Sequence, residues 1–169
     1  MDLVIVLGTI LNPRSDDCVD YYPRGALVLK RVGKSDGFRI LDLTQHKIAL
    51  DKYADSSVGS VTVLDYSGKV ILPSFFDSHF HWVQDDVCLK PKENLLEWLS
   101  NYTWPHEALF KSERFSLEKA KEFAQKLRQV GTLGGAIYGT IHPYTVDLAQ
   151  EWFVGDFVVG NVLMDINSP

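Results

Sequence analysis

The amino-acid sequence predicts a mixed α/β protein, in which a β-rich segment at residues 1–70 precedes alternating strands and helices at residues 71–169. The 169 residues are 46% hydrophobic and 12% aromatic, which is enough apolar material for a buried core and argues against disorder. Up to residue 70, short β-rich runs are separated by Gly, Asp, Ser and Pro. Beyond it, apolar runs alternate with helical patterns, as is typical of parallel βαβ units.

Four apolar runs in the β-rich segment have the length and the bounding residues of strands. They are LVIVLGTIL at residues 3–11, GALVLKRV at 25–32, GFRILDL at 37–43 and SVTVLDYSGKVIL at 60–72. The first run does not resemble a signal peptide, because the residue before it, Asp2, is acidic and the run is broken at Gly8 and closed by Pro13. We therefore expect a β-sheet region here.

Three apolar runs in the second half are expected to form parallel strands, with helices between them. The runs are VILPSFFDSH at residues 70–79, GGAIYGTIH at 134–142 and DFVVGNVLMD at 156–165. The clearest helix is predicted to begin with a cap at Ser116 and to end at Gly131. An earlier helical pattern is predicted to form one buried stripe from Leu95, Leu96, Trp98, Leu99 and Tyr102.

Two histidines, His79 and His81, stand one residue apart at the end of the first of these strands. In an extended strand, side chains at this spacing project to the same face, about 7 Å apart at the backbone. Zinc–nitrogen bonds are short, about 2.0 to 2.1 Å, so both rings must lean toward one point, which a strand end permits. Parallel α/β sheets also bind ligands at the carboxyl ends of their strands. The pair is therefore a candidate metal site.

A structural role is the alternative for this pair, because two histidines at this spacing also arise by chance and can form ordinary hydrogen bonds at a strand end. The apolar run VILPSFFD directly before them favours the metal site. Asp77 is expected on the same face, where it either orients an imidazole or serves the structure alone.

Composition excludes several classes of partner. The formal net charge is −5 at pH 7 without a basic cluster, so neither nucleic acid nor a membrane is expected as a partner, and a small molecule is favoured. No apolar stretch approaches the roughly 20 residues of a membrane span. The two cysteines, Cys18 and Cys88, lack a CxxC spacing, which fits a reducing compartment. A cytoplasmic protein is expected.

The run LPSFFDSHFH at residues 72–81 resembles the Pro-Gly-Phe-x-Asp-x-His-x-His pattern of the amidohydrolase superfamily, with Ser74 in place of the usual glycine. Within that superfamily the sequence is most similar to guanine deaminases. The similarity rests on Gln84, three residues after the second histidine, and on LLEWLSNYTWPHE at 95–107. YGTIH at 138–142 and VGNVLMDIN at 159–167 also resemble that family's second and third barrel strands. The resemblance covers roughly residues 70–167.

The resemblance implies a fold and a reaction. Residues 1–70 would belong to a small β-sandwich, and residues 71–169 would supply the first three strands of a (β/α)8 barrel of the TIM type, which is incomplete in this chain. His79 and His81 would be two ligands of one zinc ion, with iron as the alternative, and Gln84 would bind guanine through its amide donor and acceptor. Guanine deaminases hydrolyse guanine to xanthine and ammonia on a metal-activated water. The glutamate that moves the protons is expected beyond Pro169, and the full-length protein is expected to be a homodimer.

The other histidines are not assigned to the metal. His142 follows the second predicted strand but is not expected to be a ligand. His46, in the β-rich region, and His106, in an expected polar loop, are interpreted as bystanders. Trp82 is expected to pack in the core.

Three hypotheses for function remain. The chain is part of a zinc-dependent guanine deaminase, or of another amidohydrolase of the chlorohydrolase or cytosine deaminase kind, or it is a truncated product without catalytic function. Gln84 and the segment YTWPHE favour the first hypothesis over the second. The strands missing from the barrel keep the third open, and they lead us to expect that this chain alone is inactive.

Overall fold

The computed structural model describes residues 2–33, 37–54 and 59–163. The chain divides into two compact units, Met1–Pro73 and Ser74–Pro169. The first unit holds a sheet with mostly antiparallel pairing, and the second holds a parallel sheet with helices, so the prediction of a mixed α/β protein is confirmed. In the part of the chain that is described, no helix is both long and apolar enough to cross a membrane.

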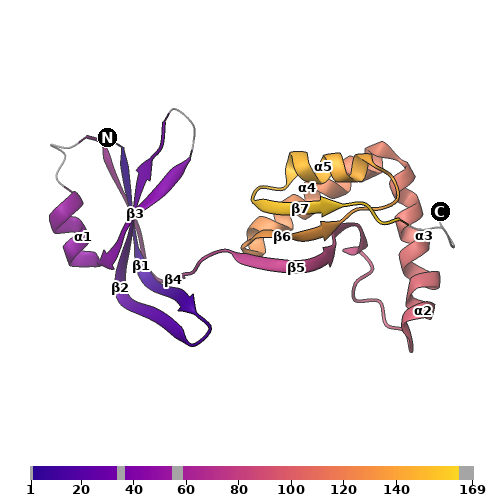
Figure 1. The fold of residues 1–169 in the computed structure, drawn as a ribbon, viewed down its shortest axis with the longest axis horizontal. Coiled ribbons are helices and arrows are strands. Elements are labelled where there is room, and N and C mark those ends of the chain that lie inside the picture. Colours follow the sequence, from indigo (N-terminus) through magenta and orange to yellow (C-terminus); the bar gives the residue numbers. More distant parts are fainter. Residues whose placement is uncertain (1, 34–36, 55–58, 164–169) are drawn as a thin grey trace. The chain divides into compact units, whose positions relative to one another are not determined.

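The first unit is built on a four-stranded sheet with the order β3-β2-β1-β4 (Figure 1). Its strands are β1 (Leu3–Ser15), β2 (Cys18–Arg31), β3 (Phe38–Gln45) and β4 (Val61–Ile71). Neighbouring strands are antiparallel except that β1 and β4 run parallel. All four predicted β runs are therefore found as strands.

One face of this sheet is closed by a helix that sequence analysis did not predict, α1 (His46–Tyr53). Ile5, Leu7 and Val28 alternate along β1 and β2, and they pack with Ala49 of α1 in a buried cluster. The alternation follows from the two-residue period of a strand, which turns every second side chain to the same face. His46 is the first residue of α1 and belongs to this unit.

The second unit contains three parallel strands in the order β5-β6-β7. They are β5 (Phe75–His81), β6 (Thr132–Tyr138) and β7 (Asp156–Gly160), and they are joined through the helices α4 (Glu113–Val130) and α5 (Tyr144–Trp152). Figure 1 shows both helices on the same side of the strands. The predicted βαβ rhythm is confirmed. The strand expected at residues 156–165 ends at Gly160, and residues 164 and 165 lie outside the described residues.

The core of this unit lies between the strands and the helices. Trp82, Ile137 and Phe153 are buried there, together with Ala120 and Ala124 of α4. The small α4 side chains let the helix approach closely, while the large aromatic rings fill the remaining space. Trp82 is therefore a core residue, as the sequence predicted.

The helix α4 begins earlier than the sequence predicted. Its N-cap is Ser112, whose side chain accepts a hydrogen bond from the backbone N–H of Phe115 at 3.4 Å. Ser116, the predicted cap, lies within the helix, and its buried hydroxyl donates to the carbonyl oxygens of Phe110 and Ser112. Both serines precede apolar helical positions, so the pattern alone did not separate them. Gly131 does end the helix, with a left-handed φ of 75° that a glycine adopts without steric strain.

The helical segment at residues 95–107 also differs from its prediction. It consists of α2 (Leu95–Trp98), a wider π-helical turn (Leu99–Thr103) and α3 (Trp104–Glu107). Leu95 and Leu96 are 66% and 71% exposed, so the expected buried stripe is wrong for both. The wider turn changes the helical period on which that stripe was based. His106 lies in α3, which corrects its assignment to a polar loop.

Candidate functional site

The candidate site is at the carboxyl end of β5, where the strand carries His79 and His81 on one face. The centroids of the two imidazole rings are 5.3 Å apart, and the rings meet edge to face. Tyr138, at the carboxyl end of the neighbouring strand β6, is the register partner of His81. Parallel pairing thus gathers three rings at one edge of the sheet, where loops follow each strand.

Tyr138 contacts both histidines. Its ring centroid is 4.9 Å from that of His79 and 5.0 Å from that of His81, and it stacks on His81 at an interplanar angle of 24°. Such contacts restrict the rotation of the imidazoles and keep them on the same side of β5. The two histidines are therefore held as a pair by the adjacent strand.

The two imidazoles differ in burial. His79 is exposed, whereas His81 is half-buried, and its Nδ1 atom has no hydrogen-bond partner within the described residues. Burial, followed by the neighbouring charge of His79, lowers the pKa of His81. At neutral pH the His81 ring is therefore uncharged, which is the form of imidazole that binds a metal ion.

Asp77 acts on the backbone of the strand. Its Oδ1 atom accepts a hydrogen bond from the backbone N–H of His79 at 3.0 Å. This contact favours the structural alternative for Asp77 over the orientation of an imidazole ring. The backbone here is also closely packed, since a Cβ atom on Gly135 of β6 would lie 2.2 Å from the carbonyl oxygen of Asp77. Only glycine fits that position.

Gln84 follows the histidines in a short 3-10 turn, Trp82–Gln84. Trp82 and Val83 are buried in the core and anchor the turn, while Gln84 is half-buried. The Nε2 atom of Gln84 donates a hydrogen bond to Oε1 of Glu107 at 2.8 Å. The structure thus connects the end of β5 to α3, two elements that lie far apart in the sequence.

Glu107 is the residue of this region that the sequence analysis did not single out. It is only 3% exposed, and burial raises the pKa of its carboxyl group, an effect that the Gln84 hydrogen bond partly opposes. A signal was present, because Glu107 is the last residue of the family-like segment LLEWLSNYTWPHE. Nothing in that segment, however, indicates which residue its carboxylate contacts.

The remaining histidines have other surroundings. His142 lies in the loop after β6, where its backbone N–H donates to Thr140 Oγ1 and its ring stacks on Tyr144. His106 lies 3.7 Å from Asp86, and the pKa of His106 is lowered, mainly by burial, so the ring is uncharged at neutral pH. Within the described ranges, no three His, Cys, Asp or Glu side chains come together as a metal site.

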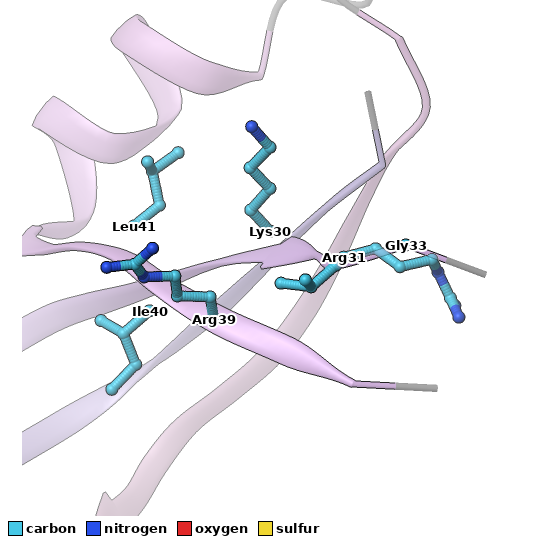
Figure 2. Close-up of a pocket in the computed structure, with 7 residues that line it drawn as sticks. Lys30, Arg31, Gly33, Arg39, Ile40 and Leu41 are labelled. Atoms are coloured by element: carbon cyan, nitrogen blue, oxygen red, sulfur yellow. The ribbon is translucent and has the colours of Figure 1, made fainter. Parts of the chain in front are cut away.

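A separate pocket lies in the first unit, between β2 and β3 (Figure 2). Its volume is about 580 Å³, and its lining includes Lys30, Arg39, Ile40 and Leu41. Lys30 and Arg39 are register partners on the two strands. None of the predicted site residues lines this pocket, so we locate the candidate site at the end of β5.

The chain is similar to known guanine deaminases. It is 30% identical to guanine deaminase of Escherichia coli K12 over 167 residues, which is 97% of this chain and 36% of that enzyme. The solved E. coli enzyme matches with a TM-score of 0.79 at 26% identity, covering 99% of this chain and 38% of that one. The C. acetobutylicum guanine deaminase, solved with guanine in its active site, matches over 99% of this chain and 38% of its own with a TM-score of 0.74; at 22% identity it supports the fold alone.

One similar protein has a different named substrate. A 5-methylthioadenosine/S-adenosylhomocysteine deaminase of Thermococcus sibiricus is 31% identical over 86 residues, which is 47% of this chain and 15% of that enzyme. No family model matches the chain. The chain spans little more than a third of the length of the guanine deaminases that it matches. It is therefore a homologue of the guanine deaminases, in the amidohydrolase superfamily, and corresponds to their N-terminal part.

Proposed function

We propose that this chain is the N-terminal portion of a metal-dependent guanine deaminase, which hydrolyses guanine to xanthine and ammonia. The observation that carries the proposal is the arrangement at the end of β5. Two imidazoles share one face there, and Gln84 follows in the next turn. The chain that carries these residues is 30% identical to E. coli guanine deaminase, and the match covers 97% of this chain.

The proposal includes the architecture of the full-length enzyme, by which we mean residues 1–169 together with the further chain that completes the barrel. The strands β5, β6 and β7 would be the first three of eight, with residues 71–169 as their part of the barrel. Residues 1–70 would be part of a β-sandwich. Cys18 and Cys88 are both free and exposed, which supports a reducing cytoplasmic location. A homodimer also belongs to this proposal.

His79 and His81 fit the metal as two of its ligands. Their rings share one side of β5, and His81 combines a buried Nδ1 atom that lacks a hydrogen-bond partner with an uncharged ring. A bound zinc ion, or iron in its place, would activate the water molecule that replaces the amino group of the purine. Because catalytic zinc sites use about three protein ligands, the others and the proton-transferring glutamate would come from the part of the enzyme outside this chain.

Gln84 is proposed to bind the purine. Its side-chain amide offers a donor and an acceptor, which suits the edge of guanine, where donors and acceptors alternate. Half-burial beside the core turn at Trp82 and Val83 limits its motion. Gln84 would thus orient guanine, while His79 and His81 hold the metal beside it.

Ammonia release tests the proposal. We expect metal-loaded full-length enzyme to release ammonia from guanine and to leave adenine and cytosine unchanged. Release from cytosine without release from guanine would reject it in favour of another amidohydrolase, of the cytosine deaminase or chlorohydrolase kind. An inert full-length preparation with bound metal would favour a protein without catalytic function.

A second candidate substrate follows from the similarity to the Thermococcus sibiricus enzyme, which is named for adenine-type nucleosides. The same assay distinguishes it when 5-methylthioadenosine is included. The longer match to E. coli guanine deaminase, 97% of the chain against 47%, favours guanine.

A further inference from the structure

The hydrogen bond between Gln84 and Glu107 fixes which way the side-chain amide of Gln84 is turned. The position of Gln84 in the sequence does not determine this orientation. An amide side chain has an oxygen at one branch and nitrogen at the other, and a half-turn exchanges them at little cost. An ionised carboxylate can only accept hydrogen bonds. Glu107 therefore selects the rotamer with Nε2 toward it, at 2.8 Å, and turns Oε1 away.

No other hydrogen bond of the Gln84 amide is found among the described residues. Its carbonyl oxygen and its second N–H are consequently available to a ligand, in an order set by the Glu107 contact. Glu107 itself is placed firmly, because it is 3% exposed and its side chain is hydrogen-bonded to Gln84. A carboxylate held this way is a fixed reference for the amide.

We propose that Glu107 is a positioning residue for Gln84, and that its carboxylate determines the order in which the Gln84 acceptor and donor face a bound purine. The proposal rests on the proposed function, since it assumes that Gln84 meets guanine. Glu107 would act on the substrate only through the glutamine.

Burial of the Glu107 carboxyl group lowers stability rather than adding to it. Burial raises the pKa of Glu107, which means that its charged form is disfavoured by the fold. A glutamine at this position would also accept a hydrogen bond from Gln84 without introducing a charge. It would, however, donate equally well, so that Gln84 could turn over. The carboxylate therefore gives up stability for a defined orientation.

The kinetic test is a double-mutant cycle in the full-length enzyme with guanine as substrate. Because Glu107→Gln loosens one hydrogen-bonded orientation, we expect KM to rise about fivefold and kcat to stay within about twofold. In a Gln84→Ala background, Glu107→Gln should have no further effect on KM, because the residue that it positions is gone. Glu118→Gln, an exposed glutamate of α4, is the matched control.

Two results would overturn the inference. One is an unchanged KM in Glu107→Gln, and the other is an equal rise in KM with and without Gln84, which would indicate a purely structural role. A wild-type enzyme that does not act on guanine at all would instead reject the proposed function. The two failures are therefore distinguishable.

A second measurement does not depend on activity. In the full-length enzyme, nitrogen-15 NMR would follow the side-chain amide of Gln84, assigned through its loss in Gln84→Ala. We expect Glu107→Gln to shift both amide protons of Gln84, since the carboxyl acceptor at 2.8 Å is replaced by an amide. Unshifted protons would contradict the contact on which the inference stands. Glu118→Gln should leave them in place.

Discussion

At the scale of single residues, the site depends on how neighbours restrict side chains that are otherwise adaptable. Tyr138 stacks on His81 and also contacts His79, while Glu107 restricts Gln84. The sequence could predict that the histidines share a face, because strand periodicity requires it. It could not predict that Tyr138 contacts the histidines or that Glu107 contacts Gln84, since these contacts arise from strand register and from the path of the helical segment.

The first prediction concerns the histidines. Replacing both His79 and His81 by Ala in the full-length enzyme should remove bound zinc, because each is proposed to supply one nitrogen ligand. Elemental analysis of the purified variant measures zinc per chain. Gln84→Ala should keep its zinc, as should His46→Ala, which changes a histidine of the first unit. Undiminished zinc in the double variant would show that the pair is structural.

The second prediction concerns Glu107 and pH. Because burial raises the pKa of Glu107 in the folded state, the wild-type protein loses stability as pH rises from the ordinary carboxyl pKa through the raised one. Glu107→Gln cannot ionise and escapes this loss. Its free energy of unfolding, relative to wild type, should therefore be higher at about pH 8 than at about pH 4.

Urea unfolding at the two pH values provides this measurement, with Glu118→Gln as the exposed control. A stability difference between Glu107→Gln and wild type that does not change with pH would contradict the prediction. If Glu107→Gln gains stability at the higher pH and also has a weaker affinity for guanine, Glu107 is a residue that serves binding and lowers the stability of the fold.

At the scale of elements, the strands and the end of α4 were predictable, and several helical details were not. Alternating apolar residues and the left-handed Gly131 have local causes, so they can be read from short stretches of sequence. Two serines precede the same apolar pattern, so the sequence does not decide between Ser112 and Ser116 as the cap of α4. The exposed Leu95 and Leu96 were missed because the wider turn at Leu99–Thr103 interrupts an ordinary helical period.

The third prediction tests the cap of α4. Ser112→Ala should lower the free energy of unfolding by about 1 kcal/mol, because the backbone N–H of Phe115 loses its acceptor. Ser100→Ala is a suitable control, since the Ser100 hydroxyl bonds only to carbonyl groups of its own helical segment. Chemical denaturation of both variants compares them. Equal stability of Ser112→Ala and wild type would show that this cap contributes little.

At the scale of the whole molecule, the three parallel strands leave large apolar side chains in contact with water. Phe76 on β5 and Val158 on β7 are 68% and 73% exposed. Parallel sheets are normally covered on both faces, because their strands are apolar throughout. The exposed residues therefore support the proposal that further strands and helices of a full-length deaminase pack here. From the sequence, the missing strands could be predicted only through the family resemblance. Which apolar side chains are exposed could not be predicted, because this depends on how the three strands pack.

The last prediction is that the 169-residue chain alone releases no measurable ammonia from guanine, even with zinc supplied. The proposed ligands His79 and His81 are an incomplete set, and the described residues bring no third His, Cys, Asp or Glu to them. Glu107 is buried and bonds to Gln84, and no contact with either histidine is found among the described residues, so we do not assign it as the missing proton carrier. Added zinc changes neither fact. The assay uses purified chain of confirmed mass, with full-length enzyme as the positive control. Turnover of about 1 per second, which is ordinary for an enzyme, would show that these residues already form a complete site.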